Sequence, residues 1–281
     1  MSAGFTVLHT SDFQCGRPYL SRATDALMEL WSEVDPNVVI ASGDLTQRAK
    51  KREFRVARSI LERFGDTPVV VTPGNHDVPL YRFWERLIDP FGNWRRFAGE
   101  EALDTVTTVP GAVIVALNSA APRRAIVNGR IDDAQVEFAR RAFLGSDPSN
   151  VRMLVIHHHF VPVPDGEAGQ PLPGAARLAH AFSDMGVDVV LGGHVHQIHM
   201  HVAEDIPGCP RRDPPLPILA CGTSTSRRGR GVEAGWNSVS VMRFGDGTLE
   251  VTPYRRAPDA SAFEAMPARS WLLRGGLGAV N

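Results

Sequence analysis

Side chains of the kinds that bind metal ions are concentrated in five short segments of the sequence. The segments contain Asp12 and Gln14, Asp44, Asn75 and His76, His157 to His159, and His194 and His196. Carboxylate and amide oxygens suit hard or borderline divalent cations, and imidazole nitrogens suit transition metals. This mixture predicts a site for two adjacent divalent cations, with Asp44 bridging them. Two cations roughly 3.5–4 Å apart can hold the attacking and leaving oxygens of an in-line displacement and acidify a bridging water.

Histidine is unusually clustered, because eight of the ten histidines lie between positions 157 and 201. Imidazoles gathered beside turn glycines favour metal or acid–base chemistry. His158 is left open between the substrate pocket and local packing. The other histidines outside the predicted site are expected to have packing or surface roles: His9, His159, His180, His199 and His201.

Each of the five segments directly follows a short run that is predicted to be a β-strand. The runs are Phe5–Thr10, Val38–Ala41, Val69–Val71, Val151–Ile156 and Val187–Leu191. In an open parallel sheet the C-terminal ends of the strands line one crevice, where ligands bind. We therefore expect the five segments to meet at one place, although they are far apart in the sequence.

Helical patterns alternate with these strands and predict parallel sheets joined by crossovers. The patterns cover 20–33, 54–64, 132–143 and 175–182, and shorter strands are expected at 106–109, 113–117, 198–202, 217–221, 238–244 and 249–254. Gly245-Asp246-Gly247 is a hairpin signal between the last two strands. We expect one domain over 1–281, with sheets inside and helices outside, and a weakly patterned C-terminal tail over 257–281.

An aromatic and basic stretch, Tyr81 to Phe97, follows the third segment. We expect a helix, a turn and a second helix, and we favour a packed helical pair over a cap on the substrate pocket.

Composition excludes several classes of protein. The net charge is −1, with 30 Lys+Arg against 31 Asp+Glu, so nothing steers the whole chain toward nucleic acid or membrane, and we expect no nucleic-acid partner. Cys15, Cys209 and Cys221 lack CxxC spacing, which argues against a disulfide framework and a cysteine-ligated zinc site. Cys15 is expected to be a small buried filler. No apolar run is long enough for a transmembrane helix, and we expect a cytoplasmic protein whose oligomeric state is left open.

The motifs SDFQ, SGDLT, GNHD, IHHH and GGHVH, in this order from Asp12 to His196, resemble those of the calcineurin-like metallophosphoesterase superfamily. Asn118-Ser119 followed by GRIDDAQVEF, and the later GTSTSRR, look like its cyclic-nucleotide phosphodiesterase (class III) branch. The resemblance implies an α/β fold in the form of a four-layer α/β/β/α sandwich, the metallo-dependent phosphatase fold.

The resemblance also implies a role for each candidate residue. One metal would be held by Asp12, Gln14, Asp44 and His196, and the second by Asp44, Asn75, His157 and His194. Beside the bridging Asp44, His76 would be catalytic: it would stabilise transition-state charge or protonate the leaving alkoxide. Substrate binding would fall to His158, Arg227 and Arg228, although the two arginines also fit a solvated loop.

Gln14 departs from the family pattern, which usually has histidine at this position. An amide oxygen is a weaker and harder donor than imidazole. We therefore expect two divalent metal ions with Mn²⁺ or Fe²⁺ favoured, while Zn²⁺ is still accepted.

The expected function is hydrolysis of a phosphodiester, a 3′,5′-cyclic nucleotide or similar small diester, by attack of a metal-bridged hydroxide. Two alternatives remain open at this point. One is a pyrophosphate hydrolase acting on a nucleotide-sugar or a lipid precursor, and the other is a non-catalytic scaffold with the same fold. In each enzymatic case the partner is a small phosphoester substrate.

Overall fold

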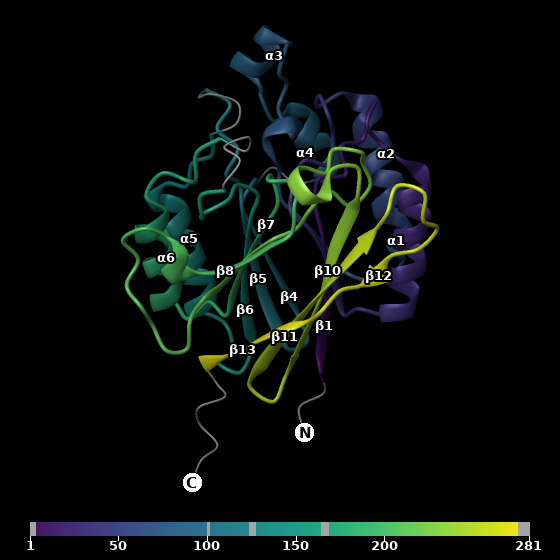
Figure 1. Ribbon diagram of the computed structural model, residues 1–281. Coiled ribbons are helices and arrows are strands. Elements are labelled where there is room, and N and C mark those ends of the chain that lie inside the picture. Colours follow the sequence, from purple (N-terminus) through teal and green to yellow (C-terminus); the bar gives the residue numbers. More distant parts are fainter. Residues whose placement is uncertain (1–3, 100–101, 124–127, 164–168, 275–281) are drawn as a thin grey trace.

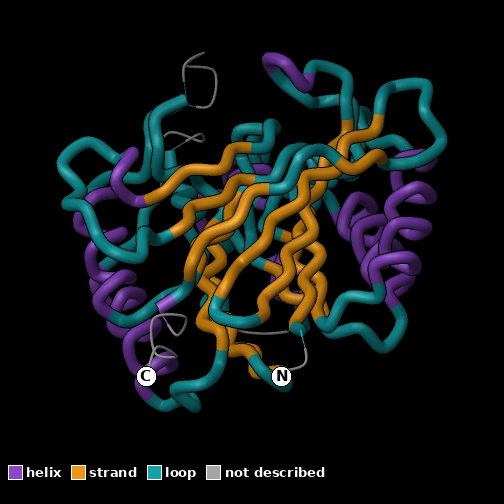
Figure 2. Tube along the Cα trace, turned by 60° about the horizontal axis from the view of Figure 1, so that its bottom comes forward, coloured by secondary structure: helices purple, strands orange, loops and turns teal. Residues whose placement is uncertain are grey.

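Two β-sheets lie face to face in this protein, and helices cover the outer face of each sheet (Figures 1 and 2). The structure is a computed structural model that describes residues 4–99, 102–123, 128–163 and 169–274. The order of layers is helix, sheet, sheet, helix, so the predicted α/β/β/α sandwich is confirmed.

The first sheet contains the N-terminal strands and the C-terminal hairpin. Within the described residues its order is β12 (Glu264–Ala265), β11 (Thr248–Arg256), β10 (Asn237–Gly245), β1 (Phe5–Thr10), β2 (Val38–Ala41) and β3 (Val69–Val71), and β13 (Arg269–Leu272) also pairs with β11. Strands β1, β2 and β3 are parallel, whereas β10 runs antiparallel to β1. The C-terminal ends of β1, β2 and β3 therefore point to the same edge of the sheet.

The second sheet is built from the middle of the chain. Its order, in the part of the chain that is described, is β4 (Thr105–Val109), β5 (Ala112–Leu117), β6 (Val151–Ile156), β7 (Val189–Gly192), β9 (Pro217–Ala220) and β8 (His199–Val202). The four central strands are parallel, and β4 and β8 are antiparallel edge strands. Each expected strand is present, with ends that differ by one or two residues.

The helices divide between the two outer layers (Figure 1). α1 (Ser21–Val34), α2 (Lys51–Leu61) and α4 (Gly92–Ala98) lie on the first sheet, and α5 (Asp133–Leu144) and α6 (Ala175–Asp184) lie on the second. Single 3-10 turns occur at Glu62–Phe64 (η1), Asn75–Asp77 (η2), Ala203–Asp205 (η3) and Gly231–Glu233 (η4). Among the described residues, no helix is both long and apolar enough to cross a bilayer.

The central strands are buried on both faces, which explains their continuous apolar sequences. Along β1, Val7 packs between the two sheets while Leu8 packs under the helices. In β6 the alternation repeats, because Met153 contributes to the core between the sheets and Leu154 to the core under α5 and α6. Successive side chains of a strand point to opposite faces, so one apolar run supplies two cores.

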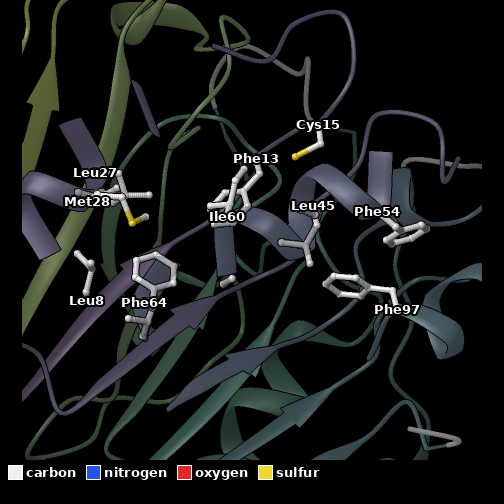
Figure 3. Packing of buried hydrophobic residues seen from close by; sticks show 14 of the residues in the cluster. Leu8, Phe13, Cys15, Leu27, Met28, Leu45, Phe54, Ile60, Phe64 and Phe97 are labelled. Atoms are coloured by element: carbon white, nitrogen blue, oxygen red, sulfur yellow. The ribbon is translucent and has the colours of Figure 1, made fainter. Parts of the chain in front are cut away.

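The core between the first sheet and its helices is rich in aromatic rings. Phe54 of α2 faces Phe97 of α4, with ring centroids 5.2 Å apart (Figure 3). Trp94 packs on Phe54 at 6.2 Å. Cys15 is fully buried in the same cluster, as expected for a small filler.

The C-terminal part of the chain completes the first sheet. Gly245 pairs with Thr248, so only Asp246 and Gly247 form the turn, with φ values of 49° and 71°. Two positive φ values identify a type I′ turn, and the hairpin predicted from the sequence is confirmed. Beyond this hairpin, β12 and β13 pair with β11, and Trp271 is buried. Positions 275–281 of the predicted tail lie outside the described residues.

The aromatic stretch departs from the expectation. The predicted helix–turn–helix is present as α3 (Phe83–Ile88) and α4, but only α4 lies against α2. Every residue of α3 is at least partly exposed. The interpretation as a packed helical pair is therefore wrong for α3, because after the turn around Pro90 only the second helix reaches the aromatic cluster.

The two-sheet core predicts a large effect for truncation at its centre. Ile114 of β5 is fully buried between the sheets, so Ile114→Ala is expected to lower the free energy of unfolding by about 2–5 kcal/mol. Urea unfolding followed by circular dichroism measures the change. Val106→Ala on the exposed edge strand β4 is the matched control and should stay within about 0.5 kcal/mol of the wild type. Equal effects of the two substitutions would contradict the assignment of this core.

Candidate metal centre and active site

The five donor segments meet at the rim where the two sheets open. Asp12 and Gln14 follow β1, Asp44 follows β2, and Asn75 forms part of η2 after β3. From the facing sheet, one loop begins with His157 after β6, and another carries His194 and His196 after β7. The facing rims bring the segments to one place because all five strands run toward it.

The carboxylate of Asp44 lies at the centre of this arrangement and is 1% exposed. Its Oδ2 accepts a hydrogen bond from Gln14 Nε2 at 2.9 Å, and its Oδ1 accepts one from the backbone N–H of His76 at 2.7 Å. The Nε2 atom of His157 lies 3.4 Å from Oδ1. Asp44 thus contacts groups from both sheets.

Asp12 is the second buried carboxylate. Its Oδ2 accepts hydrogen bonds from the hydroxyl of Ser11 at 2.7 Å and from the backbone N–H of His194 at 3.0 Å. Its Oδ1 lies 3.3 Å from Nε2 of His196. Asp12 therefore connects the loop after β1 with the loop after β7.

Two of the histidines are oriented by groups behind them. Nδ1 of His157 lies 2.7 Å from the backbone oxygen of Ser42, and Nδ1 of His194 lies 2.9 Å from Oδ1 of Asn75. Because these oxygens accept, each Nδ1 carries a proton, and Nε2 is the nitrogen that is left to bind a metal. Histidines that bind metals in proteins are fixed in this way by a partner on the other nitrogen.

The donor set fits a metal centre. Ligand atoms of Asp12, Asp44 and His157 all lie within 4.8 Å of one another. Asp12 Oδ1, His157 Nε2 and His196 Nδ1 are buried and make no hydrogen bond in the structure, although buried polar atoms are almost always satisfied. Oxygen and nitrogen atoms arranged in this way are suitable ligands for divalent cations.

Electrostatics in the site reflect two carboxylates in a small buried space. Burial raises the pKa of Asp12 to about 6. Burial also disfavours the charged form of Asp44, but His157 and His76 outweigh it and hold the pKa of this carboxyl well below its usual value. For His157, Asp44 and Asp12 outweigh burial and raise the pKa to about 9. The two carboxylates thus stabilise positive charge close to them. A divalent cation would compete with the proton of His157 for the Nε2 atom of that ring.

The loops hold several candidate ligands in an uncommon backbone conformation. Among the described residues, eight non-glycine residues have a positive φ, and five of them are candidate ligands, with φ between 51° and 74°: Asp12, Gln14, Asp44, His194 and His196. This region is sparsely populated by residues with a side chain, and each instance costs of order 1–3 kcal/mol. Such strain concentrates at functional sites, so the backbone independently marks this rim as a site.

Glycines allow the loops to approach one another. A Cβ at Gly43, which has a φ of 98°, would lie 2.5 Å from Nδ1 of His157. A Cβ at Gly74 would overlap the carboxylate of Asp44. These two motif glycines are required by the close contact between the loops after β2, β3 and β6.

Asp77 has a structural role that the sequence analysis missed. Its Oδ2 accepts from the backbone N–H groups of Gly74 at 3.0 Å and Leu45 at 3.2 Å. Its Oδ1 accepts from the N–H of Thr46 at 2.8 Å and from the Thr46 hydroxyl at 2.9 Å. The carboxylate therefore joins the Asp44 loop to the Asn75 loop. Its position at the end of the GNHD motif, three residues after a turn glycine, was the signal for it.

His76 lies between two arginines at the open side of the site. Its Nδ1 is 2.9 Å from the backbone oxygen of Gln47, which also accepts from Nη1 of Arg48 at 3.4 Å. Its Nε2 is 3.1 Å from Nη1 of Arg228. The same guanidinium nitrogen donates to Oε1 of Gln14 at 2.9 Å. Arg48, which the sequence analysis did not single out, and Arg228 thus flank the candidate catalytic histidine.

The remaining candidates are placed in different ways. His158 is buried, with Nδ1 2.7 Å from the Ser119 hydroxyl and its ring centroid 4.6 Å from that of His194. Arg227 is exposed, unlike Arg228. The rings of His199 and His201 stack at 5.6 Å on one face of β8, as expected for alternate residues of a strand.

The sequence matches the family model described as calcineurin-like phosphoesterase over residues 5–198. The chain belongs to the calcineurin-like phosphoesterase family. This confirms the predicted family, and the chain is a metal-dependent phosphoester hydrolase. The match covers all five donor segments.

Comparisons with individual proteins agree with this family. This calcineurin-like phosphoesterase is 27% identical to the cAMP/cGMP dual specificity phosphodiesterase of Mycobacterium tuberculosis (strain CDC 1551 / Oshkosh), over 84% of this chain and 76% of the relative. Purple acid phosphatase from yellow lupin (Lupinus luteus) seeds has a TM-score of 0.69 at 14% identity over 96% of this chain and 54% of its own, so this chain spans about half its length. A dimetal phosphatase from Danio rerio has a TM-score of 0.59 at 12% identity over 96% and 99% of the two chains. The two structures share the fold.

The close contact at Gly74 leads to a prediction about the centre of the site. In Gly74→Ala the new methyl group displaces the Asp44 carboxylate, so the dissociation constant for Mn²⁺ should rise about tenfold or more. Isothermal titration calorimetry measures it. Gly245→Ala is the matched control, because a Cβ there meets nothing within 4 Å. Unchanged Mn²⁺ binding in Gly74→Ala would contradict a ligand role for Asp44.

Proposed function

We propose that this phosphoesterase hydrolyses a phosphodiester, and that a 3′,5′-cyclic nucleotide or a similarly small diester is its substrate. The observation that carries the proposal is the convergence of Asp12, Asp44 and His157, whose ligand atoms lie within 4.8 Å of one another. The Mycobacterium tuberculosis relative, a cAMP/cGMP phosphodiesterase at 27% identity, supports the choice of a cyclic nucleotide.

The proposed ligand sets share Asp44. One set is Asp12, Gln14, Asp44 and His196, and the other is Asp44, Asn75, His157 and His194. Two divalent cations bound there would supply positive charge for the phosphoryl group and acidify a water near neutral pH. Mn²⁺ and Fe²⁺ suit the oxygen-rich set that contains Gln14 better than Zn²⁺ does.

His76 and Arg228 are proposed to act together on the phosphoryl group. The Gln47 carbonyl fixes the proton of His76 on Nδ1, so Nε2 accepts from Arg228. A neutral ring in this tautomer orients Arg228, whose guanidinium supplies the charge for the developing oxyanion. Donation of a proton by His76 to the leaving alkoxide would require a second proton on the ring and withdrawal of Arg228 from Nε2.

The substrate side of the site is proposed to include His158, Arg227 and Arg228. His158 borders the centre through its contact with His194. Arg228 faces the centre through Gln14 and His76. Arg227 is exposed on the same loop, where it can meet only a part of the substrate that extends outward.

A pyrophosphate hydrolase is the second candidate function, because a further cation lies near His76. Arg48 reaches the Gln47 carbonyl on the side of the ring opposite Arg228. A second guanidinium group near the candidate catalytic histidine suits a substrate with two adjacent phosphates. A small cyclic diester carries a single negative charge and needs one of them.

A substrate panel tests both functions. The purified chain with Mn²⁺ should hydrolyse bis(p-nitrophenyl) phosphate, and cyclic AMP or cyclic GMP should be turned over faster than a nucleotide-sugar diphosphate. EDTA should abolish turnover, and Mn²⁺ should restore it. Asp44→Asn should lower turnover at least about 100-fold while its circular dichroism spectrum stays unchanged. Faster cleavage of the pyrophosphate bond would select the second function, and turnover by Asp44→Asn close to that of the wild type would refute the metal assignment.

Gln14 provides a test of metal preference. Gln14→His replaces an amide with a softer donor, so the ratio of Zn²⁺ to Mn²⁺ affinity should rise about tenfold, measured by competitive titration. Gln47→His is the matched control, because the Gln47 side chain accepts from the backbone N–H of Arg17 at 3.2 Å and has no hydrogen bond to a candidate ligand in the described part of the chain. A metal profile that is the same in Gln14→His and the wild type would remove Gln14 from the ligand set.

A further inference from the structure

Helix α3 presents an apolar face to the surroundings. It projects from the body beyond α4, on the side of the molecule where the donor segments meet (Figure 1). Its large apolar residues are 48–77% exposed: Phe83, Trp84, Leu87 and Ile88. Positions i, i+1, i+4 and i+5 lie on one side of a helix, and Glu85 and Arg86 occupy the other side. Contiguous exposed apolar surface of this kind marks an interaction site.

The exposed helix is held in place by its base. The guanidinium of Arg82 donates to the backbone oxygens of Arg48 at 3.0 Å and Ala49 at 2.9 Å. The Arg48 guanidinium lies over the ring of Tyr81, 5.1 Å from its centroid. On the other side, α4 is anchored in the core through Trp94, which is 2% exposed. The apolar face is thus presented by a fixed support.

Basic side chains border the apolar face. Lys50, Lys51 and Arg96 line the same hollow as Trp84 and Ile88. All three of these basic residues are exposed.

Among the described residues, the two acids that line this hollow are paired. Glu85 bonds Arg82 at 2.8 Å, and Asp89 bonds Arg95 at 3.0 Å. Because these acids are paired with arginines, the charges of Lys50 and Lys51 give a positive surface beside the exposed aromatic and aliphatic side chains.

We propose that α3 docks on the surface of a lipid bilayer that contains anionic lipids. The apolar face would enter the headgroup region, and Lys50, Lys51 and Arg96 would meet the lipid phosphates. Tryptophan and tyrosine suit this position, because an apolar ring with a polar atom fits the boundary between water and lipid.

The size of the face favours a bilayer over a protein partner. A stable protein interface buries about 800 Å² on each side and involves roughly 20–30 residues. A projecting helix of six residues is much smaller than that. Shallow insertion into headgroups needs only a few large side chains supported by basic residues. This docking does not depend on the proposed function, and its test measures binding without catalysis.

Vesicle flotation tests the proposal with the full chain. The wild type should float with vesicles of phosphatidylcholine and phosphatidylglycerol, and less with phosphatidylcholine alone. Phe83→Ser/Trp84→Ser should lower the partition coefficient about tenfold or more. Lys50→Glu/Lys51→Glu should lower it on anionic vesicles and remove its dependence on salt. Leu144→Ser on α5 is the matched control, because Leu144 is 74% exposed on a helix that covers the second sheet, and it should bind as the wild type does.

Three results would overturn the proposal. The first is a wild type that does not float with anionic vesicles. The second is a Phe83→Ser/Trp84→Ser variant that floats as well as the wild type. The third is a wild type that binds no vesicles but forms, in sedimentation velocity, a dimer that the α3 substitutions abolish. The last result would assign the face to a second copy of the chain. Circular dichroism and hydrolysis of soluble bis(p-nitrophenyl) phosphate, both expected to be unchanged in the variants, show that loss of flotation is not loss of folding.

Discussion

The burial of two carboxylates side by side is the constraint on which the rest of the site depends. The side chains of Asp12 and Asp44 are at most 1% exposed. The charged form of a carboxylate is unstable at such a buried position unless hydrogen bonds or opposite charges stabilise it. The compensation comes from backbone N–H groups of His76 and His194, from the Gln14 amide and from the charge on His157. A divalent cation is the strongest compensating charge that this donor set can accept. The cost of the arrangement is thus a reason to expect metal binding.

The sandwich makes this arrangement attainable. A single parallel sheet would supply loops from one rim, whereas two facing sheets supply loops from both sides of a narrow space. The loops after β1 and β2 provide the carboxylates of Asp12 and Asp44, and the loop after β3 provides Asn75. The loops after β6 and β7 provide His157, His194 and His196. Backbone hydrogen bonds hold the loops together. For example, the backbone N–H of Gln14 donates to the backbone oxygen of Asp44 at 2.9 Å. Left-handed backbone conformations at the candidate ligands are the consequence of fitting short loops into this space.

The strands and the positions of the donors could be predicted because both follow from local patterns. Apolar runs that are followed by Asp, Asn or His are visible in the sequence. The predicted ends of the strands differ from the observed ends by at most two residues. The role of Asp77 had a signal in the GNHD motif and was missed. The place of Arg48 beside His76 and the exposure of α3 could not be predicted, because each depends on which loop or helix lies nearby after folding. In α3, the same aromatic composition that suggested a packed helix produces an exposed one. Composition reports an apolar surface without reporting what covers it.

Gln14 shows why an amide can suit this site better than an imidazole. Its Nε2 donates to Asp44, and its Oε1 accepts from Arg228. An imidazole that used one nitrogen for a metal would have only an N–H left, which cannot accept from Arg228. The amide oxygen has two lone pairs, so it can accept from Arg228 and still face a cation. Gln14 therefore links the buried Asp44 carboxylate to Arg228, the arginine proposed to bind the substrate, which a histidine ligand at this position would not do.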